Sequence, residues 1–370
     1  RKGCRIVMVC EDPRLAQVAS RLHRAAGMSR SLVVLCVLAL AACDKKEPPP
    51  APAAFEASEL AALKSLPKGA DPASANPDRV ALGKMLYFEA RLSKNHDVSC
   101  NSCHHLDAFG VDGTPTSEGH RKQHGNRNAP TVLNAAVAFR QFWDGRAADV
   151  EEQATGPIVN PVEMASSEPR IVATLASMPE YVSAFGRAFP GESAPITLKN
   201  VGIAIGAFER ELVVAAPIDR WLDGDRSALG PEQLAGAAAF AHAGCPSCHM
   251  GSGIGGAIYQ KAGFVEPWPN QKDQGRFDLT KQESDRMMFK VPSLRNVTKT
   301  GPYFHDGSDA SLEEAVRMMG RYQLGKELSD ADVKSIVVFL DALSAAPPAE
   351  LVAPPALPKS TDATPKPDPD

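Results

Sequence analysis

Apolar positions recur with helical spacing in several stretches of the chain. In the clearest stretch, residues 197–214, the side chains of Val201, Ile205, Phe208 and Leu212 fall on one helical face. Similar signals predict helices over residues 77–89, 168–189, 197–214, 231–243 and 330–343, and over a segment that opens with the capping-box pattern Ser311-Leu-Glu-Glu314. Aromatic residues make up only 6% of the chain, and Gly and Pro together account for 59 residues. This mix fits helices joined by long, turn-rich loops rather than a large sheet, so we expect an all-α protein.

Two long regions separate these helices and show little periodicity. Residues 106–165 and 250–310 are rich in Gly, Asn and Pro, and each follows a helix that leads into a pair of cysteines. Irregular stretches of this length inside a compact domain usually carry function. Because helix, cysteine pair and loop recur with a period near 145 residues, the pattern predicts two similar domains, residues 58–214 and 215–346. The Pro/Ala-rich residues 347–370 are predicted to be a disordered tail.

The N-terminal region has the pattern of a targeting segment. After Arg30 comes an apolar run of 13 residues that ends at Cys43, too short to span a bilayer and typical of a signal peptide. Its last four residues, Leu-Ala-Ala-Cys, resemble the lipobox of bacterial lipoproteins. We therefore predict a signal segment (1–42), a lipid anchor at Cys43 and a Pro/Ala-rich tether (43–57). An ordinary signal peptide with an incidental Cys43 is the alternative, and either places the protein in the periplasm.

Charge and cysteine content narrow the possible functions. The net charge is −4, and residues 1–42 hold seven Lys/Arg against two acidic residues, so the remaining chain carries about −9. An acidic body argues against nucleic acid as a partner. Four of the eight cysteines lie at or before Cys43. The other four form two close pairs, each followed directly by a histidine.

These pairs are two copies of Cys-x-x-Cys-His. The copies are Cys100, Cys103 and His104, and Cys245, Cys248 and His249. The motif is the attachment site of a c-type haem, in which the thiols bind the porphyrin edge and the histidine is the proximal iron ligand. A thioredoxin-like redox pair would usually follow a strand, and a zinc site would leave both histidines unexplained. Two copies in an exported chain therefore predict two covalently bound haems.

The second axial ligand of each iron is less clear from the residues alone. Several histidines are candidates, and each taken singly is as readily a surface or core residue. Met319 shares a helical face with Leu312 and Val316, whereas Met318 is turned about 100° away. By this pattern alone Met319 is either an iron ligand or a core methionine.

Longer motifs resemble a known family. The stretches ALGKMLYFEARLS, VSCNSCH, GNRNAPTVLNAAVAFRQFWDGRAADVEEQATGPIVNPVEM, GCPSCH, VPSLRNVTKTGPYFHDGS and LEEAVRMMGRYQLGKELSDADV are similar to the bacterial di-haem cytochrome c peroxidases. The resemblance covers about residues 77–345. It implies two cytochrome-c-like helical domains with one haem each and a calcium ion between them. It also implies a peroxidatic N-terminal haem and a high-potential C-terminal haem that receives electrons.

The resemblance assigns axial ligands to both haems. His120 matches the removable histidine that caps the N-terminal haem in resting members of the family, with His124 as the alternative. Met319 matches the methionine ligand of the C-terminal haem. The usual Gly-His-Gly around the removable histidine is Gly119-His120-Arg121 here, which bears on how the loop switches.

Further matches concern chemistry and calcium. Glu163 matches the catalytic acid/base, Gln153 its polar neighbour, and Trp143 the tryptophan between the haems. The matches to the calcium ligands are Asn128, Thr300 and Pro302, whose oxygens suit a hard cation. His305 also matches, without an assigned role.

The implied activity is reduction of hydrogen peroxide to water with electrons from a small cytochrome c or cupredoxin. One alternative is a MauG-like di-haem enzyme that oxidises a partner protein. Such relatives have a tyrosine in place of the C-terminal methionine ligand, and Tyr322 lies three residues beyond Met319. Another alternative is a di-haem electron carrier or redox sensor, which would not need Glu163 or Gln153. Family members are often dimers, so a homodimer is also expected.

Overall fold

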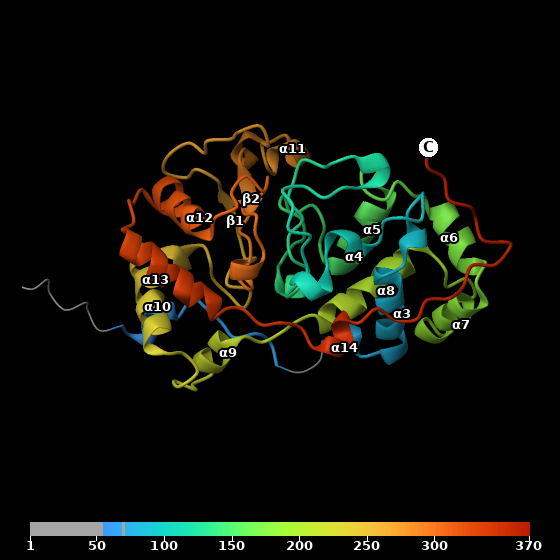
Figure 1. The fold of residues 1–370 in the computed structure, drawn as a ribbon, viewed down its shortest axis with the longest axis horizontal. Coiled ribbons are helices and arrows are strands. Elements are labelled where there is room, and N and C mark those ends of the chain that lie inside the picture. Colours follow the sequence, from blue (N-terminus) through green and yellow to red (C-terminus); the bar gives the residue numbers. More distant parts are fainter. Residues whose placement is uncertain (1–54, 69–70) are drawn as a thin grey trace, which may run out of the picture. The chain divides into compact units, whose positions relative to one another are not determined.

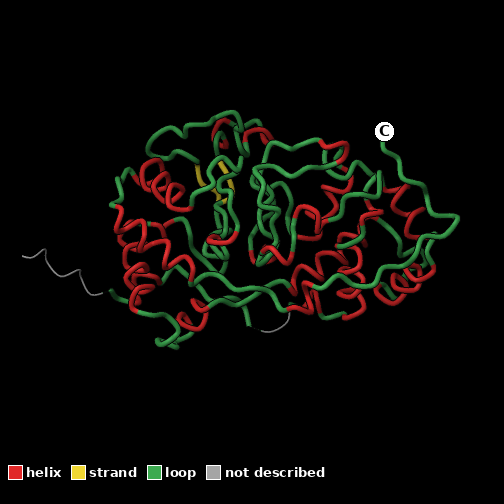
Figure 2. Tube along the Cα trace, in the orientation of Figure 1, coloured by secondary structure: helices red, strands yellow, loops and turns green. Residues whose placement is uncertain are grey.

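Helices dominate the computed structural model, which describes residues 55–68 and 71–370 (Figures 1 and 2). The α-helices are α3 (Pro77–Tyr87), α4 (Cys100–Cys103), α5 (Val150–Val159), α6 (Glu168–Ala176), α7 (Pro179–Ala188), α8 (Leu198–Glu211), α9 (Pro217–Leu222), α10 (Pro231–Ala243), α11 (Phe277–Thr280), α12 (Leu312–Met318), α13 (Asp330–Asp341) and α14 (Ala349–Val352). A π-helical turn, η10 (Met319–Gln323), continues α12. Strands β1 (Tyr259–Lys261) and β2 (Met288–Lys290) pair antiparallel, with Tyr259 opposite Lys290.

Short 3₁₀ turns complete the secondary structure. They are η1 (Ala57–Leu60), η2 (Pro72–Ser74), η3 (Ala90–Leu92), η4 (Leu106–Ala108), η5 (His120–Lys122), η6 (Ala135–Val137), η7 (Cys245–Ser247), η8 (Glu283–Asp285) and η9 (Val297–Lys299). The expectation of a helical protein is confirmed for the described residues, in which β1 and β2 are the only strands.

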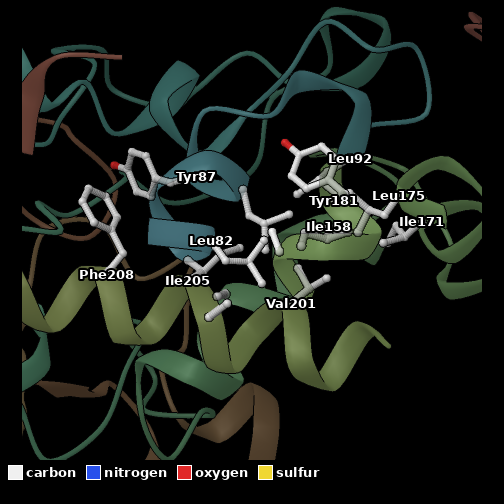
Figure 3. Packing of buried hydrophobic residues seen from close by; sticks show 14 of the residues in the cluster. Leu82, Tyr87, Leu92, Ile158, Ile171, Leu175, Tyr181, Val201, Ile205 and Phe208 are labelled. Carbon is white, nitrogen blue, oxygen red and sulfur yellow. The ribbon is translucent and has the colours of Figure 1, made fainter. Parts of the chain in front are cut away.

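One hydrophobic core, the N-terminal cluster, is formed by buried residues between Leu82 and Leu212. Helices α3, α5, α6, α7 and α8 surround it, and Figure 3 shows Leu82 of α3 facing Ile205 of α8. Helices α3 and α8 meet closely at Gly83, where a Cβ atom would lie 1.8 Å from the carbonyl oxygen of Ala204. One turn along each helix, Tyr87 and Phe208 meet edge to face, with ring centroids 5.5 Å apart.

A second core, the C-terminal cluster, repeats this arrangement. It contains Leu60, Leu63 and buried residues between Ala216 and Leu343. Helix α10 packs on α13 at Gly236, where a Cβ atom would lie 2.0 Å from the carbonyl oxygen of Ser335. One turn on, Phe240 and Phe339 pack with centroids 5.3 Å apart. In both halves, therefore, the helix before a Cys-x-x-Cys-His motif crosses a later helix at a glycine followed by an aromatic pair.

The predicted helix over residues 168–189 is two helices in the structure. Helix α6 ends at Ala176, and α7 begins with Pro179 as its first residue. Proline fixes the backbone for a helix start and cannot continue a preceding helix, so it divides the apolar pattern at this point.

The region 106–165, expected to be irregular, contains α5. Asp149 caps this helix by accepting a hydrogen bond from the backbone N–H of Glu152. Gly156 and Pro157 lie in its last turn. They made the segment look like a loop, but a proline this close to the end of a helix disturbs only the final turn.

The two ends of the described chain depart from the predicted domain limits. Leu60 and Leu63, assigned to the first domain, are buried in the C-terminal cluster, because Leu63 bridges to Gly251 and Glu59 pairs with His242. The tail 347–370, predicted to be disordered, is instead ordered and lies along α3, α6 and α7 (Figure 1). Side chains from the first half of the chain bind its backbone carbonyls, an arrangement that composition does not reveal.

The signal segment (1–42), the lipidation site at Cys43 and most of the tether (43–57) lie outside the described residues. Within the described part, none of the helices is both long and apolar enough to cross a membrane.

Candidate active site

A cavity of about 410 Å³ lies between segments of both halves. Both Cys-x-x-Cys-His motifs line it, through Cys103 and His104 from the first and Cys245, Cys248 and His249 from the second. Cys100 lines a smaller adjoining cavity of about 70 Å³, which also contacts Cys103. Two motifs 145 residues apart in sequence are thus brought to one interior space.

The first motif is held by a short capped helix. The four residues of α4 span its two cysteines, and the N–H of Ser99 donates to Ser102 Oγ at 3.0 Å. His104 follows directly, and its Nδ1 lies 3.3 Å from the carbonyl oxygen of Gly110. A proton on Nδ1 leaves Nε2 with a free lone pair. Burial lowers the pKa of His104, so the neutral form that can bind iron is favoured.

The second motif follows a sharp helix end. Gly244 ends α10 in the left-handed region (φ 101°), and the chain turns at once into η7. Glycine adopts this conformation without strain. Burial lowers the pKa of His249 to about 4, and its Nδ1 has no hydrogen-bond partner among the described residues.

These features fit c-type haem. The cavity offers two thiol pairs and two buried neutral imidazoles, the groups that such a cofactor requires. It also contains Lys290, whose ammonium forms none of the ion pairs found in the described residues and whose pKa burial lowers to about 8. A partly buried cation without an acidic partner suits a cofactor that carries two carboxylates.

Glu163 lines both cavities beside Gln153. Burial raises the pKa of the Glu163 carboxyl, and the hydrogen bond from Asn160 Nδ2 to its Oε1 (2.6 Å) opposes that rise only in part. The bond fixes the orientation of one oxygen and leaves Oε2 available. The arrangement suits a group that accepts and returns a proton.

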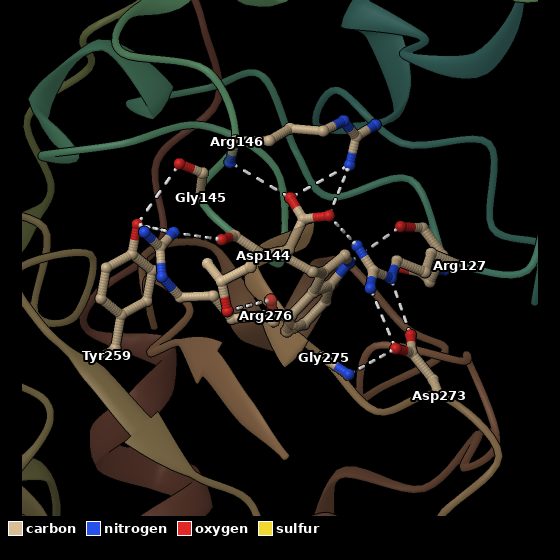
Figure 4. Close-up of polar contacts among 11 residues, drawn as sticks. Arg127, Asp144, Gly145, Arg146, Tyr259, Asp273, Gly275 and Arg276 are labelled. Carbon is tan, nitrogen blue, oxygen red and sulfur yellow. Dashed lines mark hydrogen bonds and ion pairs between the residues drawn. The ribbon is translucent and has the colours of Figure 1, made fainter. Parts of the chain in front are cut away.

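Trp143 lies at a polar junction between the two halves, and Figure 4 shows the ion pairs of Arg127 at this junction. Its Nε1 donates to the carbonyl of Asn128 at 3.0 Å, and its own carbonyl accepts from the backbone N–H of Lys290 at 2.7 Å. The junction is completed by ion pairs of Arg127 with Asp144 (2.6 Å) and Asp273 (2.7 Å). Trp143 is thus held by backbone bonds to residues from both sides.

Met319 lines the large cavity where α12 becomes the π-helical turn, and Met318 does not line it. Tyr322 is also absent from the cavity lining and instead packs on Trp268, with ring centroids 5.5 Å apart. Leu312 and Val316, which share the predicted face with Met319, line the same cavity.

The structure separates the two loop histidines. His120 is 4% exposed, and neither ring nitrogen has a partner within the described part of the chain. Its backbone N–H donates to the carbonyl oxygen of Glu163 at 2.7 Å. His124 is exposed, and its Nδ1 lies 3.0 Å from the carbonyl oxygen of Thr116. His120 lines neither cavity, so the structure places it beside the Glu163 segment with its ring buried.

The three residues matched to a calcium site all line the large cavity. Asn128 is buried, and its Nδ2 donates to the carbonyl of Thr114 at 3.0 Å, which leaves Oδ1 available to a cation. Its N–H donates to the carbonyl oxygen of His305, whose ring stacks on Phe289 at 4.3 Å. Thr300 and Pro302 add oxygen atoms but no carboxylate, so these residues fit a hard cation only with further oxygen ligands.

Two ionisable residues of the cavity lining had no role assigned from sequence. Lys290 comes directly before the stretch VPSLRN. That stretch was singled out only by its resemblance to the family, and the resemblance assigned no role to Lys290. Glu209 lines both cavities, and burial, together with the nearby charge of Glu151, raises its pKa to about 8. A signal for Glu209 was present, because it lies four residues after Ile205 beside the apolar face of α8.

Comparison with known proteins decides the family. The sequence pattern described as di-haem cytochrome c peroxidase matches residues 77–227. A cytochrome c551 peroxidase from Nitrosomonas europaea is 46% identical over 293 residues, which cover 79% of this chain and 86% of that protein. A cytochrome c551 peroxidase from Pseudomonas aeruginosa is 47% identical, covering 77% and 84%.

The chain belongs to the di-haem cytochrome c peroxidase family. The predicted resemblance is confirmed, and membership makes the protein a haem-containing oxidoreductase of the peroxidase type. More distant members include the methylamine utilization protein MauG of Methylorubrum extorquens, 36% identical over 79% of this chain and 87% of MauG. A solved structure of a MauG-like protein associated with microbial copper homeostasis matches with a TM-score of 0.67 and 27% identity, covering 79% of this chain and 96% of that one.

Proposed function

We propose that this protein reduces hydrogen peroxide to water with electrons from a small periplasmic c-type cytochrome or cupredoxin. The observation that carries the proposal is the shared cavity, where both haem motifs meet Glu163, Gln153, Trp143 and Met319. Family members named cytochrome c peroxidases support it. The overall reaction consumes one peroxide, two electrons and two protons and yields two waters.

Each half holds one haem in this proposal. His104 would hold the haem iron in the N-terminal half, and His249 together with Met319 would hold it in the C-terminal half. When bound, the haems supply the stored electrons and the iron at which peroxide is reduced. A methionine ligand favours reduced iron and suits the half that receives electrons. Lys290 would pair with a haem carboxylate.

Glu163 moves the proton. Its raised pKa makes the carboxylate a better acceptor for a proton from one peroxide oxygen, which it then returns to the other. Asn160 keeps one carboxylate oxygen oriented while the other exchanges the proton. Gln153, beside Glu163 in the cavity lining, would orient the substrate.

Trp143 would connect the two halves, because it is bonded through its indole to one and through its carbonyl to the other. Asn128, Thr300 and Pro302 would hold a calcium ion at the same junction.

His120 would cap the N-terminal iron at rest and leave when the other haem is reduced. Its buried ring without hydrogen-bond partners favours it over the exposed His124. Because its N–H binds the carbonyl of Glu163, movement of His120 would also move the segment that carries the acid/base.

The MauG-like alternative is weaker. MauG-like enzymes are expected to have a tyrosine in place of the methionine ligand. In this chain Met319 lines the cavity, whereas Tyr322 does not line it and packs on Trp268. A plain electron carrier would leave the cavity-lining Glu163 and Gln153 without a task.

Location and assembly complete the proposal. The protein would be exported to the periplasm and anchored to a membrane through lipid at Cys43. A homodimer is proposed from the resemblance alone.

The test is hydrogen peroxide turnover with a reduced small cytochrome c as donor. The protein is assayed fully oxidised and again after one-electron reduction. Turnover only after reduction supports both the activity and the His120 switch, and equal turnover in both states keeps the activity and removes the switch. Absence of turnover in both states would overturn the proposed function.

A further inference from the structure

The tail formed by residues 347–370 is bound at several points to the first half of the chain. Leu351 and Val352 pack on the N-terminal cluster. Further along, Arg91 Nη2 donates to the carbonyl of Pro358 at 2.8 Å. Thr364 is 5% exposed, and its hydroxyl lies 2.7 Å from that of Ser177. The tail is therefore a packed part of the fold.

The last residues of this tail converge on Lys94. The N–H of Asp368 donates to the Lys94 carbonyl at 3.1 Å, and the Asp368 carboxylate lies 3.4 Å from Lys94 Nζ. Arg170 of α6 donates to the carbonyls of both Lys94 and Lys366 through Nη2. A single arginine thus joins the two backbones.

Lys94 also supports the active-site segment. Its N–H donates to the carbonyl of Met164 at 2.8 Å, and Met164 directly follows Glu163. Lys94 therefore stands between the tail on one side and the candidate acid/base on the other.

A second contact reaches the His120 loop. Arg121 Nη1 donates to the carbonyl of Asp370 at 3.0 Å. Arg121 and Lys122 both have left-handed backbones, with φ of 57° and 58°. Two successive non-glycine residues in that region are strained, and such a conformation persists only where surrounding contacts hold it.

We propose that residues 366–370 are a positioning segment, which holds the His120 loop and the Glu163 segment together from outside the cavity. This inference rests on the proposed function, because His120 as the removable ligand and Glu163 as the proton carrier are roles proposed there. The two loops are joined directly by the bonds from His120 N–H to Glu163 O and from Gln123 Nε2 to Pro161 O. The tail contacts the His120 loop through Arg121 and is linked to the Glu163 segment through Lys94.

The experiment removes residues 366–370 from the haem-loaded protein and measures amide hydrogen exchange. We expect the amides of Lys94 and His120 to exchange about tenfold faster, the effect of losing one or two hydrogen bonds. The amides of α8 and α10, which the segment does not touch, should be unchanged. Unaltered exchange in the two loops would overturn the proposal, and a uniform increase throughout the chain would show general stabilisation instead.

Two variants of full length test whether the faster exchange comes from the lost contacts or from shortening the chain. Arg121→Ala removes only the contact to Asp370 and should speed exchange in residues 119–123 alone. Lys366→Ala keeps the carbonyl that Arg170 binds and should behave like the unmodified protein. The optical and EPR spectra of the N-terminal haem give a second readout, and the low-spin fraction should fall in the shortened protein. None of these measurements requires peroxide turnover, so failure of the proposed function would be seen separately.

Discussion

Glu163 is the residue where burial, orientation and proposed chemistry coincide. Glu163→Gln keeps the hydrogen bond from Asn160 to the side-chain oxygen but removes proton exchange. We expect both haems to be retained and turnover to fall by about 10²- to 10⁴-fold. Steady-state kinetics with a reduced cytochrome c measure the loss, and Glu180→Gln on the exposed face of α7 is the matched control. Near-normal turnover would remove Glu163 from the mechanism.

The same residue should set the acidic limit of turnover. Burial raises the pKa of Glu163 above its ordinary value of 4.5. Because the deprotonated form is the one that accepts a proton from peroxide, turnover should decline as the pH drops through that raised pKa. A pH profile of kcat measures the decline, which should disappear from the residual activity of Glu163→Gln. A profile shared by both proteins would place the titration elsewhere.

Met319 and Met318 provide a natural pair of variants. Met319→Leu should lower the reduction potential of the C-terminal haem by about 0.1 V or more, since axial ligands tune haem potentials over a range of roughly 0.8 V. A spectroscopic redox titration records the shift. Met318→Leu, whose side chain does not line the cavity, should leave the potential in place. Equal potentials in all three proteins would exclude Met319 as a ligand.

At the scale of residues, the sequence named many of the side chains that line the cavity but not the contacts that hold them in place. Motif spacing alone indicated the haem-binding residues, and the cavity brings both motifs together. The bond from His120 to the Glu163 carbonyl joins segments 43 residues apart through backbone atoms, which no side-chain pattern reports. Lys290 was not predicted as a site residue. It stands out only because it lacks an acidic partner among the described residues, which a sequence pattern cannot reveal.

At the scale of helices, both crossings depend on a glycine. Gly236→Ala would place a Cβ atom 2.0 Å from the Ser335 carbonyl oxygen and push α10 from α13. We expect the free energy of unfolding to fall by about 1–3 kcal/mol. Gly186→Ala in α7 meets no atom within 4 Å and should instead raise it by about 0.5–1 kcal/mol. Urea unfolding compares the two, and similar effects of both changes would contradict the packing argument.

Helix prediction succeeded where apolar spacing was regular and failed where local chemistry intervened. Helices α8, α10 and α13 lie within a few residues of their predicted limits. Helix α5 was not predicted because Gly156 and Pro157 are residues typical of loops. The break between α6 and α7 at Pro179 was not predicted either, because the apolar spacing continues across it. The tail was missed because the arginines that order it lie far away in sequence.

At the scale of the whole molecule, the ion pairs of Arg127 join the two halves of the chain. Asp273→Ala removes one of its two carboxylate partners, both of which are largely buried. We expect a loss of about 1–3 kcal/mol in unfolding free energy and a separation of thermal unfolding into two transitions. Calorimetry tests this, with Asp278→Ala at an exposed position as control. A single unchanged transition would show that the junction does not couple the halves.

Each end of the described chain packs on the half that is farther away in sequence. The two halves are therefore not expected to fold as independent domains. Leu60 and Leu63 complete the C-terminal cluster, whereas the tail completes the surface of the N-terminal half. A fragment cut at residue 214 would lose the tail, and one that starts at 215 would lose the two leucines. Contacts between such distant residues also form late, because closing a long loop must precede them. Two halves with similar helix crossings therefore depend on each other's chain ends to fold.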